Sequence, residues 1–193
     1  MDFDKALAHT LTFEGGYAND PADSGGETFR GISRRNWPEW SGWKKIDQVK
    51  ARGATTAKLI DVAFQSDMEM TQMVAAFYYL NFWKPFNSLE ASDRIVAKVF
   101  DTAVNVGVSG ATKMLQRAIN KLGPVSQLTV DGKIGPRTRS AFDIVIVVKD
   151  GEARFLRAFC AEQESHYRAI VQRKPSQAKF LKGWLRRAEW VPA

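Results

Sequence analysis

Three acidic residues and a threonine lie close together near the start of the chain. Glu14 precedes two glycines, and Asp20, Asp23 and Thr28 follow it on a glycine-rich segment. Glycosidic bonds are hydrolysed by two carboxyl groups, one that donates a proton and one that assists water or the sugar cation. We therefore expect Glu14 to face a second carboxylate, Asp23 or Asp20, across a cleft, with Thr28 positioning the water.

The residues before Glu14 predict the element that holds it. Side chains spaced three and four apart share one helical face with Glu14; they are Phe3, Ala6, Leu7, Thr10 and Leu11. Gly15 and Gly16 are expected to end this helix, because glycine adopts the left-handed backbone of a C-terminal cap. Partial burial and the negative end of the helix dipole would favour the neutral, proton-donating acid. The alternative is that Glu14 is an exposed glutamate without a catalytic role that happens to precede a glycine cap.

The segment after the helix contains the turn signals Asn-Asp-Pro and Asp-Ser-Gly-Gly,. Thr28–Ile32 is expected to form a short strand or extended piece, which would bring Thr28 near the helix end. Asp20 and Asp23 have an alternative role, since aspartate side chains often accept hydrogen bonds from their own turns.

Together these residues resemble the signature of the glycoside hydrolase 108 family. The segments that carry the resemblance are Phe13–Tyr17, Asn19–Pro21, Asp23, Gly25–Gly26, Thr28 and Gly31–Ile32. The resemblance implies a mostly helical, lysozyme-like N-acetylmuramidase with Glu14 as its catalytic acid and peptidoglycan glycan strands as its substrate. Phage lysozymes place five residues between the matching aspartate and threonine, whereas four separate Asp23 from Thr28 here. Asp20 therefore stays an alternative second carboxylate.

The rest of the chain resembles the same family. The matching segments are Tyr78–Pro85, Phe100–Gly107, Ala111, Leu115–Gln116, Asp131–Thr138 and Phe180–Arg187. Their C-terminal part resembles a peptidoglycan-binding domain. We expect a mainly α, lysozyme-like helical fold with a small irregular or β-like active-site segment. The muramidase part would cover residues 1–90 and the helical binding part residues 91–193, packed together as one compact unit.

Four further side chains are candidates to contact the glycan: Tyr17, Tyr79, Trp83 and Asn105. Tyr79 and Trp83 are four apart on a helix expected over residues 67–83, and Asn105 lies on one expected over residues 91–106. A structural role is the alternative for these three, since aromatic stripes at helical spacing usually face the core. The tryptophan-rich segment Trp37–Trp43 is expected to be irregular, and it could either stack on sugar rings or pack internally.

The 193 residues carry a formal net charge of +7 and are 45% hydrophobic. Basic residues gather near the end, namely Arg173, Lys174, Lys179, Lys182, Arg186 and Arg187. They would attract anionic envelope polymers or simply face water. No nucleic-acid-binding motif accompanies them, so we expect no nucleic-acid partner. Cys160 and the two histidines match no cysteine-hydrolase or metal-ligand pattern, so we expect a buried thiol, no metal and no cofactor,.

No signal peptide or membrane-spanning run is apparent in the sequence. We expect a monomer that is made in the host bacterial cytoplasm, without stable membrane insertion, and reaches the cell wall through a holin or another export route. The hypothesis is a bacteriolytic, antimicrobial phage or prophage endolysin that cleaves the β-1,4 bond between N-acetylmuramic acid and N-acetylglucosamine. The alternatives are a lytic transglycosylase and a non-catalytic wall-binding or secretion-associated protein.

Overall fold

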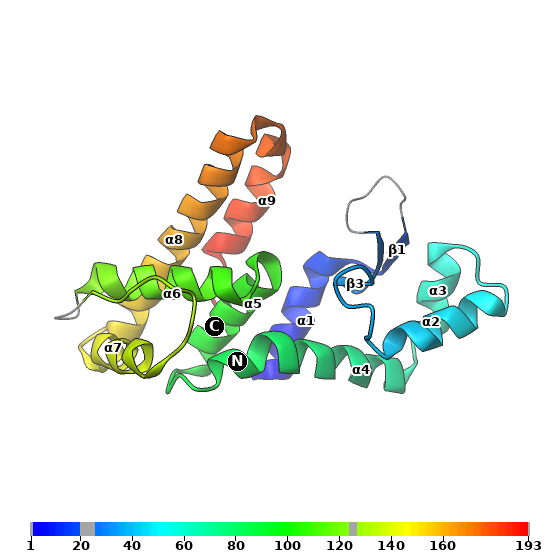
Figure 1. Ribbon diagram of the computed structural model, residues 1–193, viewed down its shortest axis with the longest axis horizontal. Helices are drawn as coiled ribbons and strands as arrows, with labels where there is room; N and C mark the ends of the chain where they lie inside the picture. Colours follow the sequence, from blue (N-terminus) through cyan, green and yellow to red (C-terminus); the bar gives the residue numbers. More distant parts are fainter. Residues whose placement is uncertain (1, 20–25, 124–126, 193) are drawn as a thin grey trace. The chain divides into compact units, whose positions relative to one another are not determined.

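The computed structural model describes residues 2–19, 26–123 and 127–192 (Figure 1). It confirms the expected fold class, because the chain is mainly α-helical and lysozyme-like with one small three-stranded sheet. Two compact units form, one from Asp4–Asn81 and one from Phe82–Ala193 with Met1–Phe3. Where the muramidase part gives way to the binding part, expected after residue 90, stays a prediction.

The unit Asp4–Asn81 contains the helix that ends at Glu14. Its elements are α1 (Phe3–Glu14), β1 (Tyr17–Asn19), β2 (Glu27–Phe29), β3 (Ile32–Ser33), α2 (Gly42–Ala51), α3 (Ala57–Phe64) and α4 (Met68–Tyr78). Helix α1 buries Ala6, Leu7 and Thr10, which confirms the predicted apolar face. Helix α4 starts at Asp67, whose side chain accepts the Met70 N–H at 2.8 Å, as an N-cap residue does,.

The small sheet places Thr28 on its central strand. The strand order is β1-β2-β3 and both pairs are antiparallel, with Thr28 opposite Ala18 on one side and Ser33 on the other. Arg30 and Gly31 form the two-residue turn between β2 and β3, with φ of 46° and 80°. Two positive φ angles in succession are typical of the hairpin turn whose twist matches that of the strands.

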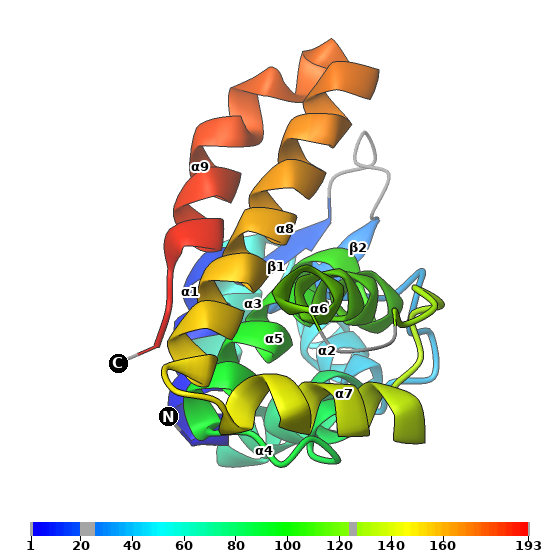
Figure 2. The ribbon, with the colours of Figure 1, turned by 90° about the vertical axis from the view of Figure 1, so that its left-hand side faces the viewer.

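The unit that begins at Phe82 contains helices joined by loops, and no strand, among its described residues. After the π-helical turn η1 (Tyr79–Trp83) and the 3-10 turn η2 (Lys84–Phe86), it contains α5 (Asp93–Val106), α6 (Val108–Leu122), α7 (Pro136–Val147), α8 (Gly151–Arg173), η3 (Pro175–Gln177) and α9 (Ala178–Glu189). Helices α8 and α9 lie side by side as a hairpin (Figures 1 and 2). Helix α5 is buried continuously from Ile95 to Ala103, so it forms the core of this unit.

Helix α5 also buries charged side chains that fix the end of α9. Asp101 is 0% exposed and accepts two hydrogen bonds of 3.0 Å from the guanidinium of Arg187. Lys98 donates to the carbonyl oxygens of Arg187 and Ala188, in the last turn of α9, where a cation is favoured,. Burial lowers the pKa of Lys98. The expectation that Arg187 belongs to a solvent-facing basic surface is therefore wrong. Its side chain is buried, and its positive charge is paired with the carboxylate of Asp101.

Candidate active site

Glu14 occupies the last position of α1 and is half-buried. Gly15 follows with φ of +67°, so it supplies the left-handed residue that ends the helix,. The predicted helix end at Gly15 is thereby confirmed. The chain then runs directly into β1, which begins at Tyr17.

The carboxyl group of Glu14 rests against the turn between β2 and β3. A Cβ atom placed on Gly31 would lie 2.9 Å from Glu14 Oε2 and 3.0 Å from Glu14 Cβ. The same atom would lie 2.5 Å from the hydroxyl oxygen of Tyr78, a buried residue of α4. Tyr78 donates this hydroxyl to the Arg30 carbonyl oxygen at 2.7 Å. The end of α1, the hairpin turn and α4 therefore meet at Glu14.

The second glycine of the pair has a different role from the first. A Cβ atom on Gly16 would lie 2.5 Å from Asp61 Oδ2, so a side chain here would displace the Asp61 carboxylate. Asp61, in α3, accepts the Tyr17 N–H at 2.8 Å. The Arg30 N–H donates to the Gly16 carbonyl oxygen at 3.0 Å. Gly16 thus lets α3 and the hairpin turn fix the backbone that follows Glu14.

Tyr17 belongs to a partly buried polar network on the same sheet. Its hydroxyl donates to Glu27 Oε1 at 2.7 Å, and Glu27 also pairs with Arg34 at 2.7 Å and Lys50 at 3.1 Å. Arg34 pairs in turn with Asp47. Burial alone would raise the pKa of Glu27, but these hydrogen bonds outweigh it and hold the pKa below its ordinary value. Tyr17 is buried with its polar atom occupied, which is the environment of a residue that positions the sheet.

This network predicts that the unit Asp4–Asn81 loses stability at acidic pH. Because the pKa of Glu27 is lowered in the folded chain, its contribution to stability is present above the ordinary value and is lost as pH falls through the lowered one,. Replacing Glu27 by glutamine is expected to lower the melting temperature near neutrality and to flatten its fall below about pH 5. Thermal unfolding of both proteins across this range measures the effect.

Glu69→Gln is the matched control for the Glu27 substitution. Glu69 also pairs with a lysine, Lys45, but its side chain is 74% exposed, so its contribution to stability is expected to be small,. An identical pH dependence of melting in the parent and in Glu27→Gln would contradict the role of the network.

Thr28 is half-buried on the central strand of the sheet. The expectation of one extended piece over Thr28–Ile32 is wrong, because the hairpin turn at Arg30 and Gly31 divides it between β2 and β3. The two candidate second carboxylates, Asp20 and Asp23, lie outside the described residues. Which of them faces Glu14 stays a prediction, and so does the role of Thr28 in holding water.

The other candidate glycan contacts lie in different surroundings. Tyr79, in η1, is 37% exposed. Trp83 is 6% exposed, and its ring packs edge-on against those of Phe3 and Phe100, with centroid distances of 5.3 and 5.4 Å. Asn105 Oδ1 accepts the Tyr167 hydroxyl at 2.7 Å. Tyr79 therefore offers more surface to a ligand than Trp83, whose ring is largely covered.

Sequence reasoning missed two residues that shape the surroundings of Glu14. Asp61 and Tyr78 reach the Glu14 turn from α3 and α4, far along the chain. The sequence contains a partial signal for Tyr78, which begins a segment of the family resemblance. For Asp61 it contains none, because a lone aspartate within a helix is usually solvent-exposed.

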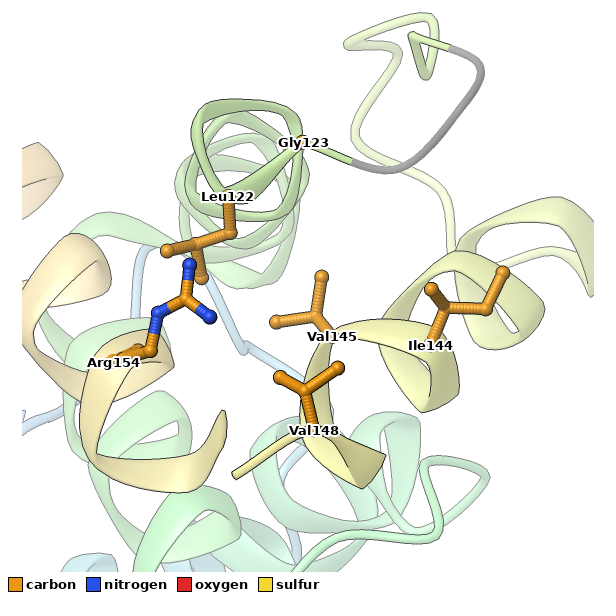
Figure 3. Close-up of a pocket in the computed structure, with 6 residues that line it drawn as sticks. All are labelled: Leu122, Gly123, Ile144, Val145, Val148 and Arg154. Atoms are coloured by element: carbon orange, nitrogen blue, oxygen red, sulfur yellow. The ribbon is translucent and has the colours of Figure 1, made fainter. Parts of the chain in front are cut away.

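A metal centre or a small cavity between helices would be an alternative site in the described part of the chain. Within residues 2–19, 26–123 and 127–192, no three His, Cys, Asp or Glu side chains are grouped to hold a metal ion. A small cavity of about 90 Å³ lies between α6, α7 and α8 (Figure 3), lined by Leu122, Gly123, Ile144, Val145, Val148 and Arg154. Its lining is aliphatic apart from Arg154 and includes no carboxyl group, so it lacks the acid that glycoside hydrolysis requires.

The fold and the glutamate held at a helix end beside a short hairpin define a lysozyme-like glycoside hydrolase. The sequence model of the glycosyl hydrolase 108 family matches residues 7–107, more than half of the chain, and the chain belongs to this family. A second model, described as a predicted peptidoglycan domain, matches residues 110–189. Both confirm the resemblance seen in the sequence, and they identify peptidoglycan as the material on which the chain acts.

One solved structure supports the same assignment. The structure of Brucella abortus SagA is similar over 96% of this chain and 88% of that chain, with a TM-score of 0.60 and 26% sequence identity. The similarity thus extends over both units. Among curated proteins, none matches the chain.

Proposed function

We propose that the chain is an N-acetylmuramidase, which hydrolyses the β-1,4 bond between N-acetylmuramic acid and N-acetylglucosamine. The observation that carries the proposal is the placement of Glu14. Glu14 is half-buried at the end of α1, and its carboxyl group lies against Gly31 near the Tyr78 hydroxyl. A carboxyl group held rigidly in a partly buried place is suited to donate a proton to a leaving oxygen.

The reaction needs two carboxyl groups with different tasks. Glu14 donates its proton to the glycosidic oxygen while the bond from that oxygen to the anomeric carbon breaks. A water oxygen then bonds to the anomeric carbon, either directly or after a covalent intermediate has formed. Asp23 or Asp20 would assist this step by taking up the proton of the water or by stabilising the positive charge on the sugar. Thr28 would position the water.

Mass spectrometry of the fragments released from purified peptidoglycan tests this proposal. Hydrolysis at the proposed bond leaves reducing N-acetylmuramic acid ends. Ends of 1,6-anhydro-muramic acid would instead identify a lytic transglycosylase, and reducing N-acetylglucosamine ends would identify hydrolysis of the other glycosidic bond. Wall binding without any released fragment would identify a non-catalytic wall-binding protein.

We further propose that this activity serves host lysis by a phage or prophage. The proposal includes synthesis in the host cytoplasm and passage to the wall through a holin. In the described residues, no helix is long and apolar enough to cross a membrane. Five exposed cations would draw the protein to anionic envelope polymers; they are Arg173, Lys174, Lys179, Lys182 and Arg186. Release of the protein only when a holin is co-expressed is the expected result of a lysis assay.

A further inference from the structure

An open groove of about 560 Å³ lies in the unit that contains Glu14. One wall is formed by the tryptophan-rich loop around Trp37 and Trp40, and the other by Phe77 and Leu80 at the end of α4 and in η1. Trp37 is 38% exposed and Leu80 is 56% exposed. This volume is within the range of small-molecule sites, and large exposed apolar side chains along a groove commonly mark a binding surface.

Trp37 is held in place by its neighbours, so its exposed ring is a fixed platform. The Trp37 N–H donates to the Ser33 carbonyl oxygen at 2.9 Å. The buried Trp43 indole N–H donates to the Trp37 carbonyl oxygen at 2.8 Å. The Trp37 ring meets that of Phe77 edge-on, with a centroid distance of 5.0 Å. A rigid aromatic surface loses little conformational entropy when a ligand covers it.

The groove shares two supporting segments with the surroundings of Glu14. Ser33, which holds the Trp37 N–H, is the strand partner of Thr28. On the opposite wall, Phe77 precedes Tyr78, whose hydroxyl bonds the hairpin turn against which Glu14 rests. The segment that carries Trp37 and the end of α4 therefore each support both the groove and the turn against which Glu14 rests.

The chemistry of the lining selects among parts of the wall polymer. Among the described residues that line the groove, Glu39 alone is charged, and it is acidic, while Asn36, Ser41 and Asn81 supply neutral polar groups. Carboxylates of peptide stems would be repelled by Glu39 and would find no cation here. An N-acetylglucosamine unit is uncharged, with an apolar ring face for the aromatic wall and hydroxyl and amide groups for the polar rim.

We propose that this groove is a subsite for the uncharged N-acetylglucosamine units of the glycan strand, with Trp37 as the platform on which a sugar ring stacks. The inference rests on the proposed function for the identity of the polymer. It adds a specificity element, because the groove takes the bare sugar and excludes the sugar that bears the peptide.

Binding of an N-acetylglucosamine tetramer to the Glu14→Gln protein tests this without any cleavage. Calorimetry would compare that parent with the same protein carrying Trp37→Ala, Trp37→Phe or Leu59→Ala. Trp37→Ala is expected to weaken binding about tenfold or more, as truncation of an aromatic anchor does. Trp37→Phe should restore most of the affinity, because it keeps an aromatic face. Leu59→Ala truncates an apolar side chain that is 49% exposed elsewhere in the unit, and it should leave binding unchanged.

The outcomes separate this inference from the proposed activity. A parent that does not bind the tetramer, or a Trp37→Ala protein that binds it equally well, overturns the subsite whatever fragments the active enzyme releases. If tetramer binding depends on Trp37 but the protein that retains Glu14 releases no fragments from peptidoglycan, the subsite stands and the muramidase activity is overturned. In the active enzyme, Trp37→Ala is expected to raise KM about tenfold with little change in kcat, the signature of lost uniform binding.

Discussion

Glu14→Gln is expected to remove nearly all release of muramic acid fragments from purified peptidoglycan. Glutamine has nearly the shape of glutamate but has no acidic proton to give to the leaving oxygen. Loss of a positioned general acid typically slows such a step by about 10² to 10⁴-fold. The rate of appearance of new reducing ends, measured under saturating substrate, reports this loss.

The substitution should leave the fold intact. The carboxyl group of Glu14 is only half-buried, and the turn beside it is held by other groups, including the bond from Tyr78 to Arg30. Melting temperature and circular dichroism should therefore match those of the parent. Glu90→Gln, at an exposed position, is the control for an effect of charge on wall binding. A folded Glu14→Gln protein with parental activity would show that another residue is the catalytic acid.

Local sequence rules predicted the position of Glu14 well because the forces that set it are local. The spacing of Ala6, Leu7 and Thr10 determines which face of α1 is buried, and Gly15 determines where the helix ends. Local rules could not explain why position 16 must be glycine. This requirement depends on Asp61, which comes 44 positions after Tyr17 in the chain. Contacts of this kind are set by the packing of α3, which no local pattern specifies.

The least predictable part of the site was the role of each polar side chain. The contact of Tyr17 with the glycan stays a prediction, and the structure adds a bond from its hydroxyl to Glu27 that the sequence did not indicate. Glu27 had no expected role, although it joins β1, the turn after β3 and α2 through three partners. The tryptophan-rich segment was expected to be irregular through Trp43, whereas α2 begins at Gly42. A sequence does not show whether a polar or aromatic side chain is exposed to a ligand or buried against other side chains, because its tertiary partners decide this.

Charge was similarly ambiguous in the sequence. Arg187 looked like one more cation of a basic surface, but it is the partner of the fully buried Asp101. A buried carboxylate without a partner is costly, so this pairing fixes α9 against α5. The surface charge available to an anionic polymer is therefore smaller than the sequence indicates. Exposed cations on α8 and α9, and Lys174 between α8 and η3, remain as the basis for that expectation.

Gly31→Ala is expected to impair catalysis more than folding. The added methyl group would lie 2.9 Å from Glu14 Oε2 and 2.5 Å from the Tyr78 hydroxyl, closer than carbon atoms normally approach oxygen. One of the three segments that meet at Glu14 must move. A displacement of about 1 Å of a reacting group can cost about 100-fold in rate, so kcat is expected to fall by that order.

The matched control is Gly53→Ala in the same unit. Gly53 also has a positive φ, +103°, but a Cβ atom there has no neighbour within 4 Å. Both substitutions carry the backbone strain of an alanine at positive φ, about 1–2 kcal/mol, and should lower the melting temperature. Gly31→Ala should lower it further, because its methyl group also overlaps Tyr78 and Glu14. Only Gly31→Ala should also lower kcat, because only its methyl group meets the acid. Equal kcat values in the two variants would mean that Glu14 tolerates displacement, and the rigid placement on which the proposed mechanism depends would have to be abandoned.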